Sequence, residues 1–432
     1  MSAAQARTLA VIGAGWAGLA AAVHATRAGH RVTLFEMAPH AGGRARDVAH
    51  DGAVLDNGQH ILIGAYRDTL ATMRLVGADP DWLLDRRPLA LVDPQGHGLA
   101  LPTGAPVPAF VRAVLALTDW PLGERLALLR AAMGWRWRGF VAKPSQTVAE
   151  LVHVLPPRVR QTLIEPLCVA ALNTPIELAS AQIFLRVLRD ALFSGPGAAD
   201  LLLPRVSLGA LFPEPALRWL AANGATLRLA TRVHTLGTQG LVDGERFDAV
   251  LLACSVHEAA RLAQPLAPSW AERAAAFQHE PIVTVYLRSD GSRWQRPMVA
   301  LSSDAAHPAQ FAFDLGALDA SNGSRAGRFA FVVSAAGHWV AEGLQATGRA
   351  VLAQAIQAFP SSAWHTPPTM LRCIAERRAT FLCRPGLDRP TIAVAAQLAA
   401  AGDYVEGPYP STLEGAVRSG ITALKTLSLL DG

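Results

Sequence analysis

Cysteine is scarce in this sequence, and no two cysteines are spaced as a CxxC pair. The chain of 432 residues contains four of them: Cys168, Cys254, Cys373 and Cys383. This usage is typical of reduced thiols in the cytoplasm and argues against a disulfide framework. The thirteen histidines show neither an HExxH motif nor paired Cys/His spacing, and a GxSxG elbow is missing. We therefore expect no metal site and no serine hydrolase.

Charge is scarce as well. Charged residues make up 17% of the chain, the formal net charge is +5, and the arginines are spread out rather than gathered in a block. Nucleic-acid binding needs such clustering, so we expect no nucleic-acid partner. A weak attraction to anionic membrane surfaces or phosphorylated metabolites stays open.

Long apolar runs are also missing, although apolar residues make up 51% of the chain. No stretch offers the roughly 18 uninterrupted apolar residues of a membrane-spanning helix. The first expected strand starts near Thr8, which leaves no room for a signal peptide. We therefore expect a cytoplasmic protein, with any membrane contact peripheral and on the cytoplasmic face. The high apolar content points to an apolar ligand or a lipid surface.

A glycine fingerprint, GxGxxG, is present between an expected strand over residues 9–12 and an expected helix over residues 17–28. In this context Gly13 permits a tight turn, and Gly15 lets the backbone approach a pyrophosphate. Gly18 lets the helix pack closely on the strand. The start of the helix, at Trp16 and Ala17, offers backbone N–H groups to phosphates. This pattern predicts a dinucleotide site.

Glu36 completes the dinucleotide pattern, and three segments beyond it favour FAD over NAD. Glu36 ends the second expected strand, 18 residues past Gly18, where a carboxylate can accept hydrogen bonds from ribose hydroxyls. Gly42-Gly43-Arg44 follows, and its guanidinium can return to the pyrophosphate. Near the C-terminus, Gly402-Asp403 offers a carboxylate for a ribityl hydroxyl or a phosphate-bound water. The helix expected from Thr412 can face the flavin pyrimidine edge with its N-terminus.

The order of expected elements predicts an α/β fold with an interrupted, doubly wound sheet. Strands expected over Thr226–Leu236 and Phe247–Cys254 return to the first sheet, and residues 66–205 between them and the fingerprint are expected to be mainly helical. We predict a Rossmann-like FAD-binding domain of the glutathione-reductase type with an inserted α+β substrate domain. The predicted FAD-binding domain comprises residues 1–66, 206–265 and 386–432, and the predicted substrate domain residues 67–205 and 266–385.

These motifs together resemble the amine oxidase and phytoene desaturase superfamily of flavoproteins. Three segments in the middle narrow the resemblance to the hydroxysqualene dehydroxylase family, squalene-associated FAD-dependent enzymes of bacterial hopanoid synthesis. They are residues 56–60 (DNGQH), 165–175 (EPLCVAALNTP) and 197–205 (GAADLLLPR). The resemblance covers nearly the whole chain. It implies FAD as cofactor and an apolar isoprenoid, hydroxysqualene, as the substrate that is reduced to squalene.

The resemblance also implies further cofactor contacts, and it places the backbone of residues 56–60 close to the isoalloxazine. The additional FAD-binding residues implied are Gly43, Gly58, Gln59, Val233, Leu413, Gly415 and Ala416.

Several residues are candidates for catalysis or substrate binding. His60 is the first candidate proton donor, since its ordinary pKa suits acid catalysis near neutrality, although a structural role is an equal alternative. Asp56 and Tyr66 are the other choices, Tyr66 also as a substrate contact. Asn173 is placed either to bind the substrate hydroxyl or to make a turn before Thr-Pro. Cys168 is expected in the substrate wall rather than as a nucleophile.

The segment Leu122–Trp137 has two open interpretations. Apolar residues at helical spacing are flanked by arginines, with tryptophans at the ends. Such a helix either rests in the headgroup layer of a membrane or packs its apolar stripe on a protein core. Periodicity alone does not say which.

The nearest rival function is an oxidative carotenoid or isoprenoid desaturase, in which the hydride runs from substrate to FAD. Weaker rivals are an amine oxidase and a non-catalytic prenyl-binding escort protein on the same fold. No second nucleotide fingerprint is visible, so the electron donor stays open.

Overall fold

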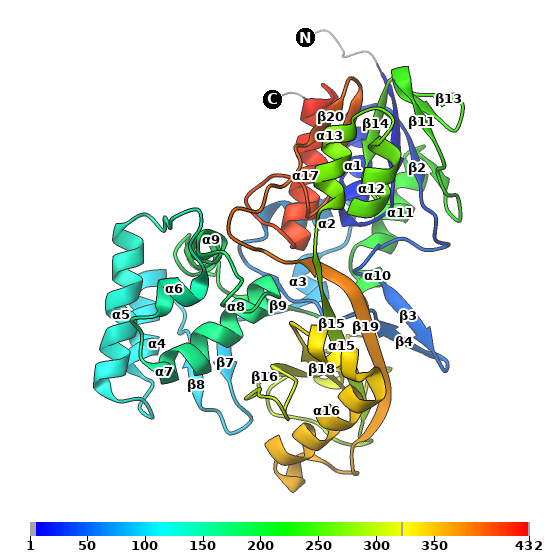
Figure 1. Cartoon of the computed structure of the whole chain (residues 1–432). Coiled ribbons are helices and arrows are strands. Elements are labelled where there is room, and N and C mark those ends of the chain that lie inside the picture. Colours follow the sequence, from blue (N-terminus) through cyan, green and yellow to red (C-terminus); the bar gives the residue numbers. More distant parts are fainter. Residues whose placement is uncertain (1–5, 321–322, 431–432) are drawn as a thin grey trace.

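A six-stranded sheet lies in the upper part of the computed structural model in Figure 1, near both chain ends. The structure describes residues 6–320 and 323–430. The strand order is β10-β2-β1-β14-β21-β20, with β20 antiparallel to β21 and the other neighbours parallel. The strands are β1 (Thr8–Ile12), β2 (Arg31–Phe35), β10 (Thr226–Arg228), β14 (Ala249–Leu252), β20 (Ala393–Ala395) and β21 (Leu398–Ala400). The central strands β1 and β14 are apolar and buried, as a parallel sheet covered on both faces requires. The expected α/β fold is confirmed.

Helices from both ends of the chain pack against each other on this sheet (Figure 1). Helix α1 (Trp16–Arg27) crosses α17 (Leu413–Thr426) so closely that a Cβ on Gly420 would lie 2.4 Å from the Ala17 carbonyl oxygen. Helix α11 (Pro213–Ala222) also packs on α1, and α2 (Arg67–Leu75) packs on α17. Helices α12 (Val256–Ala263) and α13 (Pro268–Ala275) follow β14.

A second, antiparallel sheet has the order β16-β17-β18-β15-β19. Its strands are β15 (His279–Arg288), β16 (Met298–Ala300), β17 (Phe311–Asp314), β18 (Arg328–Val333) and β19 (Thr369–Phe381). Helices α15 (Gly337–Glu342) and α16 (Leu344–Ala358) pack on it, over a separate aromatic core in which Trp294 stacks on Phe359 with ring centroids 4.1 Å apart. The long strands β15 and β19 run from this sheet towards the first one (Figure 1).

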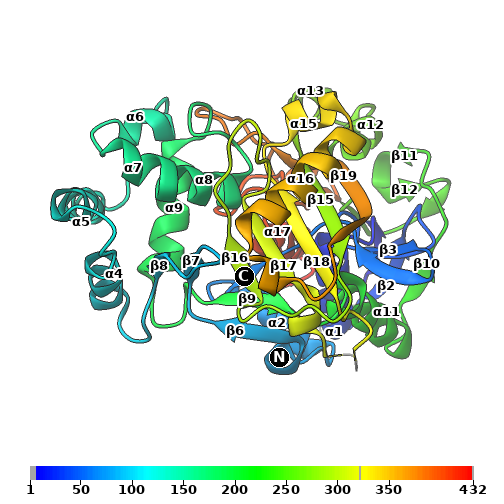
Figure 2. The same cartoon turned by 90° about the horizontal axis from the view of Figure 1, so that it is seen from below.

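A helical lobe, which we define as α4 to α9, lies to one side in both views (Figures 1 and 2). Its helices are α4 (Pro106–Leu115), α5 (Leu122–Trp137), α6 (Val148–Val152), α7 (Pro157–Val159), α8 (Glu165–Leu172) and α9 (Ala181–Leu192), with a π-helical turn at Arg160–Ile164. The remaining elements are short. They are β3 (Asp47–His50), β4 (Ala53–Asp56), β5 (Leu62–Ile63), α3 (Pro80–Leu83), β6 (Leu84–Arg87), β7 (Ala90–Val92), β8 (Gly98–Ala100), β9 (Leu201–Pro204), α10 (Leu208–Leu211), β11 (Leu236–Gly237), β12 (Leu241–Val242), β13 (Glu245–Arg246) and α14 (Leu315–Leu318).

Two expectations about secondary structure are wrong in part. The strand expected over Thr226–Leu236 is cut after Arg228, because Ala230 has a positive φ of 51° and the chain turns to bond the loop after β2. Residues 66–205 are less purely helical than expected, since β6 to β9 lie among the helices. The predicted domain boundaries remain a prediction, and residues 1–5 and 431–432 of the predicted FAD-binding domain lie outside the described residues.

Candidate functional site

The glycine fingerprint forms the turn between β1 and α1. Gly13 has a φ of 109°, its N–H donates to the Phe35 carbonyl oxygen at 2.7 Å, and a Cβ there would lie 2.6 Å from the Ala253 carbonyl oxygen. A Cβ on Gly18 would lie 1.9 Å from the Gly13 carbonyl oxygen. Both positions therefore require glycine, for the turn and for close helix–strand packing.

The first turn of α1 presents its backbone rather than its side chains. The first intrahelical bond runs from the Leu19 N–H to the Gly15 carbonyl oxygen at 2.9 Å, so the N–H groups of Trp16 and Ala17 precede it. The Trp16 side chain is buried, donates to the Ala45 carbonyl oxygen and packs on Phe212. A phosphate at this helix end would meet N–H groups and the positive end of the helix dipole.

Glu36 lies directly beside this turn. One carboxylate oxygen accepts from the Ala14 N–H at 2.8 Å, and the other accepts from the Ala38 N–H at 2.9 Å. The Glu36 backbone in turn accepts from the Thr231 N–H at 2.8 Å. These bonds bring the segment after β10 to the predicted ribose-binding carboxylate.

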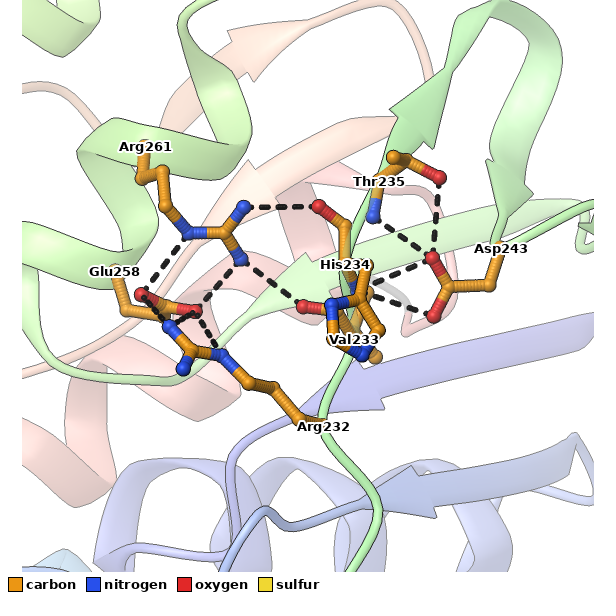
Figure 3. Close-up of polar contacts among 7 residues, drawn as sticks. All are labelled: Arg232, Val233, His234, Thr235, Asp243, Glu258 and Arg261. Carbon is orange, nitrogen blue, oxygen red and sulfur yellow. Dashed lines mark hydrogen bonds and ion pairs between the residues drawn. The ribbon is translucent and has the colours of Figure 1, made fainter.

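Val233 follows in this segment, and Figure 3 shows how its backbone is held. The Arg261 guanidinium donates to the carbonyl oxygens of Val233 and His234 at 3.0 and 2.8 Å. Glu258 holds Arg261 by an ion pair of 2.7 Å and also pairs with Arg232 at 3.1 Å. On the other side, the Asp243 carboxylate accepts from the N–H groups of His234 and Thr235. This network was not foreseen, because its members are spread over residues 232–261 without a recognisable motif.

The Gly42-Gly43-Arg44 turn lies against the fingerprint. The Gly42 N–H donates to the Ala14 carbonyl oxygen at 2.9 Å, and a Cβ on Gly43 would lie 3.3 Å from the Gly15 Cα. The two glycine turns thus meet backbone to backbone. Arg44 forms an ion pair with the buried Asp403 and donates to the Ala379 carbonyl oxygen at 2.7 Å.

The C-terminal motif is anchored next to them. Thr412 caps α17 by accepting from the Gly415 N–H at 2.9 Å, which places Leu413, Gly415 and Ala416 in the first helical turn. The Gly402 N–H donates to the Ser419 hydroxyl at 2.8 Å, which ties the Gly402-Asp403 turn to the same helix. The structure therefore brings the predicted cofactor residues of both chain ends into one region.

Glu414 is a residue of this region whose role sequence reasoning missed. It is fully buried, and its carboxylate accepts from the N–H of Thr69 at 2.9 Å, the Thr69 hydroxyl at 2.7 Å and the N–H of Asp68 at 3.2 Å. It thereby joins the N-termini of α17 and α2. Tyr66, the N-cap residue of α2, lies at this junction, and burial together with nearby Glu414 raises the pKa of its hydroxyl.

Three buried polar atoms near these turns have no hydrogen-bond partner within the described residues: Gln59 Oε1, Thr284 Oγ1 and the Tyr404 hydroxyl. Tyr404 is next to Asp403, and a Cβ on Gly58 would lie 3.7 Å from Thr284 Oγ1. Buried polar groups are rarely left unpaired in folded proteins. Their placement, beside two glycine turns and a helix N-terminus, fits a polar cofactor such as a flavin nucleotide.

Asp56 and His60, the candidate proton donors, differ in their surroundings. The Asp56 carboxyl accepts from the Leu208 N–H at 2.8 Å and lies 3.9 Å from Arg325, and burial raises its pKa to about 6. The His60 imidazole bonds the Gly58 carbonyl oxygen through Nδ1 at 2.9 Å. Burial lowers the pKa of His60, which is opposite to what a general acid near neutrality needs.

Glu376, on β19, is a further carboxylate beside these residues that sequence reasoning missed. It accepts from the Asn57 side-chain amide at 2.8 Å, and its charge acts on Arg44 and His60. No local motif marks it, because it reaches the site only through the pairing of β19 with β15.

Asn173 and Cys168 have contacts within the protein itself. Asn173 ends α8 with a φ of 46°, donates to Thr380 and to the Glu280 carbonyl oxygen, and accepts from the Ala335 N–H at 2.6 Å. These bonds favour the turn interpretation over a substrate contact. Cys168 is fully buried, and burial raises the pKa of its thiol, as expected of a packed wall residue. Among the described residues, no cluster of three or more His, Cys, Asp or Glu side chains has metal-binding geometry.

Comparison with solved structures shows the fold. An oxidoreductase from Methanosarcina mazei superposes with a TM-score of 0.71 at 15% identity, covering 97% of this chain and all of that one. Cyclohexylamine oxidase from Brevibacterium oxydans superposes with a TM-score of 0.67 at 16% identity over 98% and 99%.

Comparison with curated proteins narrows the resemblance. The chain is 28% identical to hydroxysqualene dehydroxylase of Rhodopseudomonas palustris over 96% of both chains. It is 30% identical to that of Zymomonas mobilis over 53% of this chain and 55% of the relative. A probable zeta-carotene desaturase of Synechococcus elongatus is 25% identical over 97% and 98%. The resemblance to hydroxysqualene dehydroxylases is confirmed, and that to desaturases is weaker.

The family model described as "Flavin containing amine oxidoreductase" matches residues 16–423, from the first residue of α1 almost to the end of α17. This match includes Gly18, the Gly42-Gly43-Arg44 turn and the C-terminal cap, and it begins directly after Gly15 of the first glycine turn. The chain is therefore a flavin-dependent oxidoreductase and belongs to the family of flavin-containing amine oxidoreductases.

Proposed function

We propose that the protein catalyses the FAD-dependent reduction of hydroxysqualene to squalene. The observation that carries this proposal is the similarity to a hydroxysqualene dehydroxylase over 96% of both chains. The high apolar content of the chain suits an isoprenoid substrate.

We propose FAD rather than a mononucleotide, because the site has features for both halves of a dinucleotide. Glu36 would bind the ribose of the adenosine half, and the backbone of Val233 would face its base. The first turn of α1 and Gly43 would bind the pyrophosphate, with Arg44 and Asp403 beside them. Gly58, Gln59 and the first turn of α17, with Leu413, Gly415 and Ala416, would hold the flavin half.

When bound and reduced, FAD supplies a hydride, so that a C–H bond forms at the carbon whose C–O bond breaks, and the protonated hydroxyl leaves as water. The chain must supply the proton and exclude water. His60 and Asp56 remain the proposed donors. Around His60, burial lowers the pKa of the imidazole, the hydrogen bond to the Gly58 carbonyl oxygen raises it, Arg44 lowers it, and Glu376 raises it least.

The test is anaerobic mixing of the flavin-loaded protein with defined squalene precursors. A flavin reduced beforehand should be re-oxidised by hydroxysqualene, with squalene as the product. In the same assay, His60→Gln should slow squalene formation and retain flavin. Bleaching of the oxidised flavin by an isoprenoid donor, without turnover of hydroxysqualene, would instead support a desaturase, the function suggested by the Synechococcus relative. The electron donor is a separate question, which reduction of the flavin by NADH or NADPH addresses.

A further inference from the structure

Helix α5 exposes an apolar stripe on the outer side of the helical lobe. The stripe consists of Leu122, Leu126, Met133 and Trp137, which are 57%, 43%, 51% and 91% exposed. At 3.6 residues per turn these positions fall within an arc of roughly 60°. The buried side chains of α5 are Leu128, Ala132 and Trp135, which lie on the opposite side of the helix. The stripe therefore does not face the protein core. Trp135, one of the tryptophans that the membrane interpretation places at the interface, is instead a core residue.

Exposed large apolar side chains are concentrated in the helical lobe. Seven of the thirteen large apolar side chains that are exposed within residues 6–320 and 323–430 lie between residues 115 and 154. The three outside α5 are Leu115, Val141 and Val154. Scattered exposed apolar residues are normal on a protein surface, but a stripe on a projecting helix is typical of a binding surface.

The positive net charge of the same part of the chain indicates a negatively charged partner surface. From Ala105, which caps α4, to Arg160, which ends α7, eight Arg or Lys residues stand against three Asp or Glu, a net charge of +5. This equals the formal net charge of the whole chain, so the remainder is neutral overall. On α5 itself, the exposed Arg130 and Arg136 flank the stripe on its two sides.

We propose that α5 docks the protein on the surface of a membrane that contains anionic lipids. Leu122, Leu126, Met133 and Trp137 would enter the boundary between headgroups and acyl chains, and Arg130 and Arg136 would bind lipid phosphates. Within the described residues no helix is long and apolar enough to cross a membrane, so the contact would be peripheral. The proposal rests on the surface of α5 and not on the substrate assigned above.

The test is flotation of the flavin-loaded full chain with vesicles of phosphatidylcholine alone or mixed with phosphatidylglycerol. The wild type should float with the mixed vesicles. The triple variant Leu126→Ser/Met133→Ser/Trp137→Ser should bind about tenfold less or weaker still. Arg130→Gln/Arg136→Gln should weaken binding only to the mixed vesicles, and more so at low salt. Matched controls are Ile356→Ser and Arg349→Gln, both exposed on α16, which should bind like the wild type.

Failure of the wild type to float, or flotation of the triple variant like the wild type, would overturn the proposal. Light scattering without lipid tests the other occupant, a second copy of this chain. A dimer that the triple variant converts to a monomer would assign the stripe to self-association and overturn membrane docking. If the triple variant does not fold, the arginine pair and its control still decide. None of these measurements depends on turnover, so they stand apart from the test of the reaction.

Discussion

Arg261 acts on the proposed adenosine end of the site through the backbone. Its guanidinium binds two consecutive carbonyl oxygens, those of Val233 and His234, whereas Arg232 contacts only Glu258 in the same network (Figure 3). The two arginines are therefore a matched pair for mutation. Both pair with Glu258, but only Arg261 binds the backbone of the segment proposed to face the adenine.

We predict that Arg261→Ala raises the dissociation constant for FAD several-fold, because hydrogen bonds of this kind contribute about 1 kcal/mol each. Arg232→Ala, which removes an exposed ion pair, should change it by less than about twofold. Fluorescence titration of deflavinated protein with FAD measures both. Equal effects of the two substitutions would show that the network does not position Val233.

Asp56 makes the stability of the protein depend on pH. Burial raises its pKa from 3.8 to about 6, so the folded state binds the proton more tightly than the unfolded state. Its contribution to stability is fully present below the unfolded pKa and is lost as the pH rises through the folded value. A shift of this size corresponds to roughly 3 kcal/mol.

Asp56→Asn removes this titration, since the amide keeps an oxygen for the Leu208 N–H but carries no charge. The free energy of unfolding of the variant, relative to wild type, should rise between pH 4 and pH 7 by up to about 3 kcal/mol. Urea denaturation at a series of pH values measures it, with the exposed Asp119→Asn as control. Parallel curves for wild type and Asp56→Asn would contradict the shifted pKa.

Helix α17 depends on close contact with α1. A Cβ on Gly420 would meet backbone atoms of Ala17, which have little room to move. Gly420→Ala should therefore lower the free energy of unfolding by about 1–3 kcal/mol and reduce flavin occupancy, because it pushes the flavin-side helix from the fingerprint helix.

Gly123→Ala in α5 is the matched control for Gly420→Ala. A Cβ there meets nothing within 4 Å, so the stability should be unchanged or up to about 1 kcal/mol higher. Thermal unfolding and flavin absorbance follow both variants. Similar behaviour of the two would refute the role assigned to the α1–α17 contact.

At the element scale, sequence patterns correctly predicted the helices and strands that are determined by interactions between nearby residues. The β1–α1 turn, β14 and α17 are confirmed because glycine turns, buried apolar runs and a Thr cap act over a few residues. The prediction that a strand continues after Arg228 was wrong, since Ala230 and Thr231 donate backbone hydrogen bonds to the loop after β2. The apolar positions of α5 were recognised, but which of them face solvent follows from tertiary packing.

The residues of the site divide in the same way, into those with a local motif and those positioned by distant elements. Motif positions such as Glu36, Arg44 and Asp403 were found from sequence. In the structure Arg44 pairs with Asp403, and Glu36 accepts from the Ala14 N–H of the fingerprint turn. Sequence reasoning missed the roles of Glu414, Glu376 and Arg261. Their partners lie on other elements, and no sequence motif marks these positions. Asn173 was left open between two roles, which only its bonds to Thr380 and Ala335 distinguish.

For the whole molecule, the central claim is that the two ends of the chain meet to hold one FAD. Strand β1 and helix α1 come from the first residues, and α17 from the last, and they pack against each other on one sheet. A flavin held here would tie the termini together, so its binding should also raise the unfolding temperature.

The most direct test is titration of the deflavinated chain with FAD and with FMN, followed by calorimetry and visible absorbance. The account predicts one FAD per chain, with FMN bound far more weakly and with FAD affinity reduced in Glu36→Ala. A chain that is colourless once free FAD has been removed after incubation, or that binds FMN equally well, would contradict it.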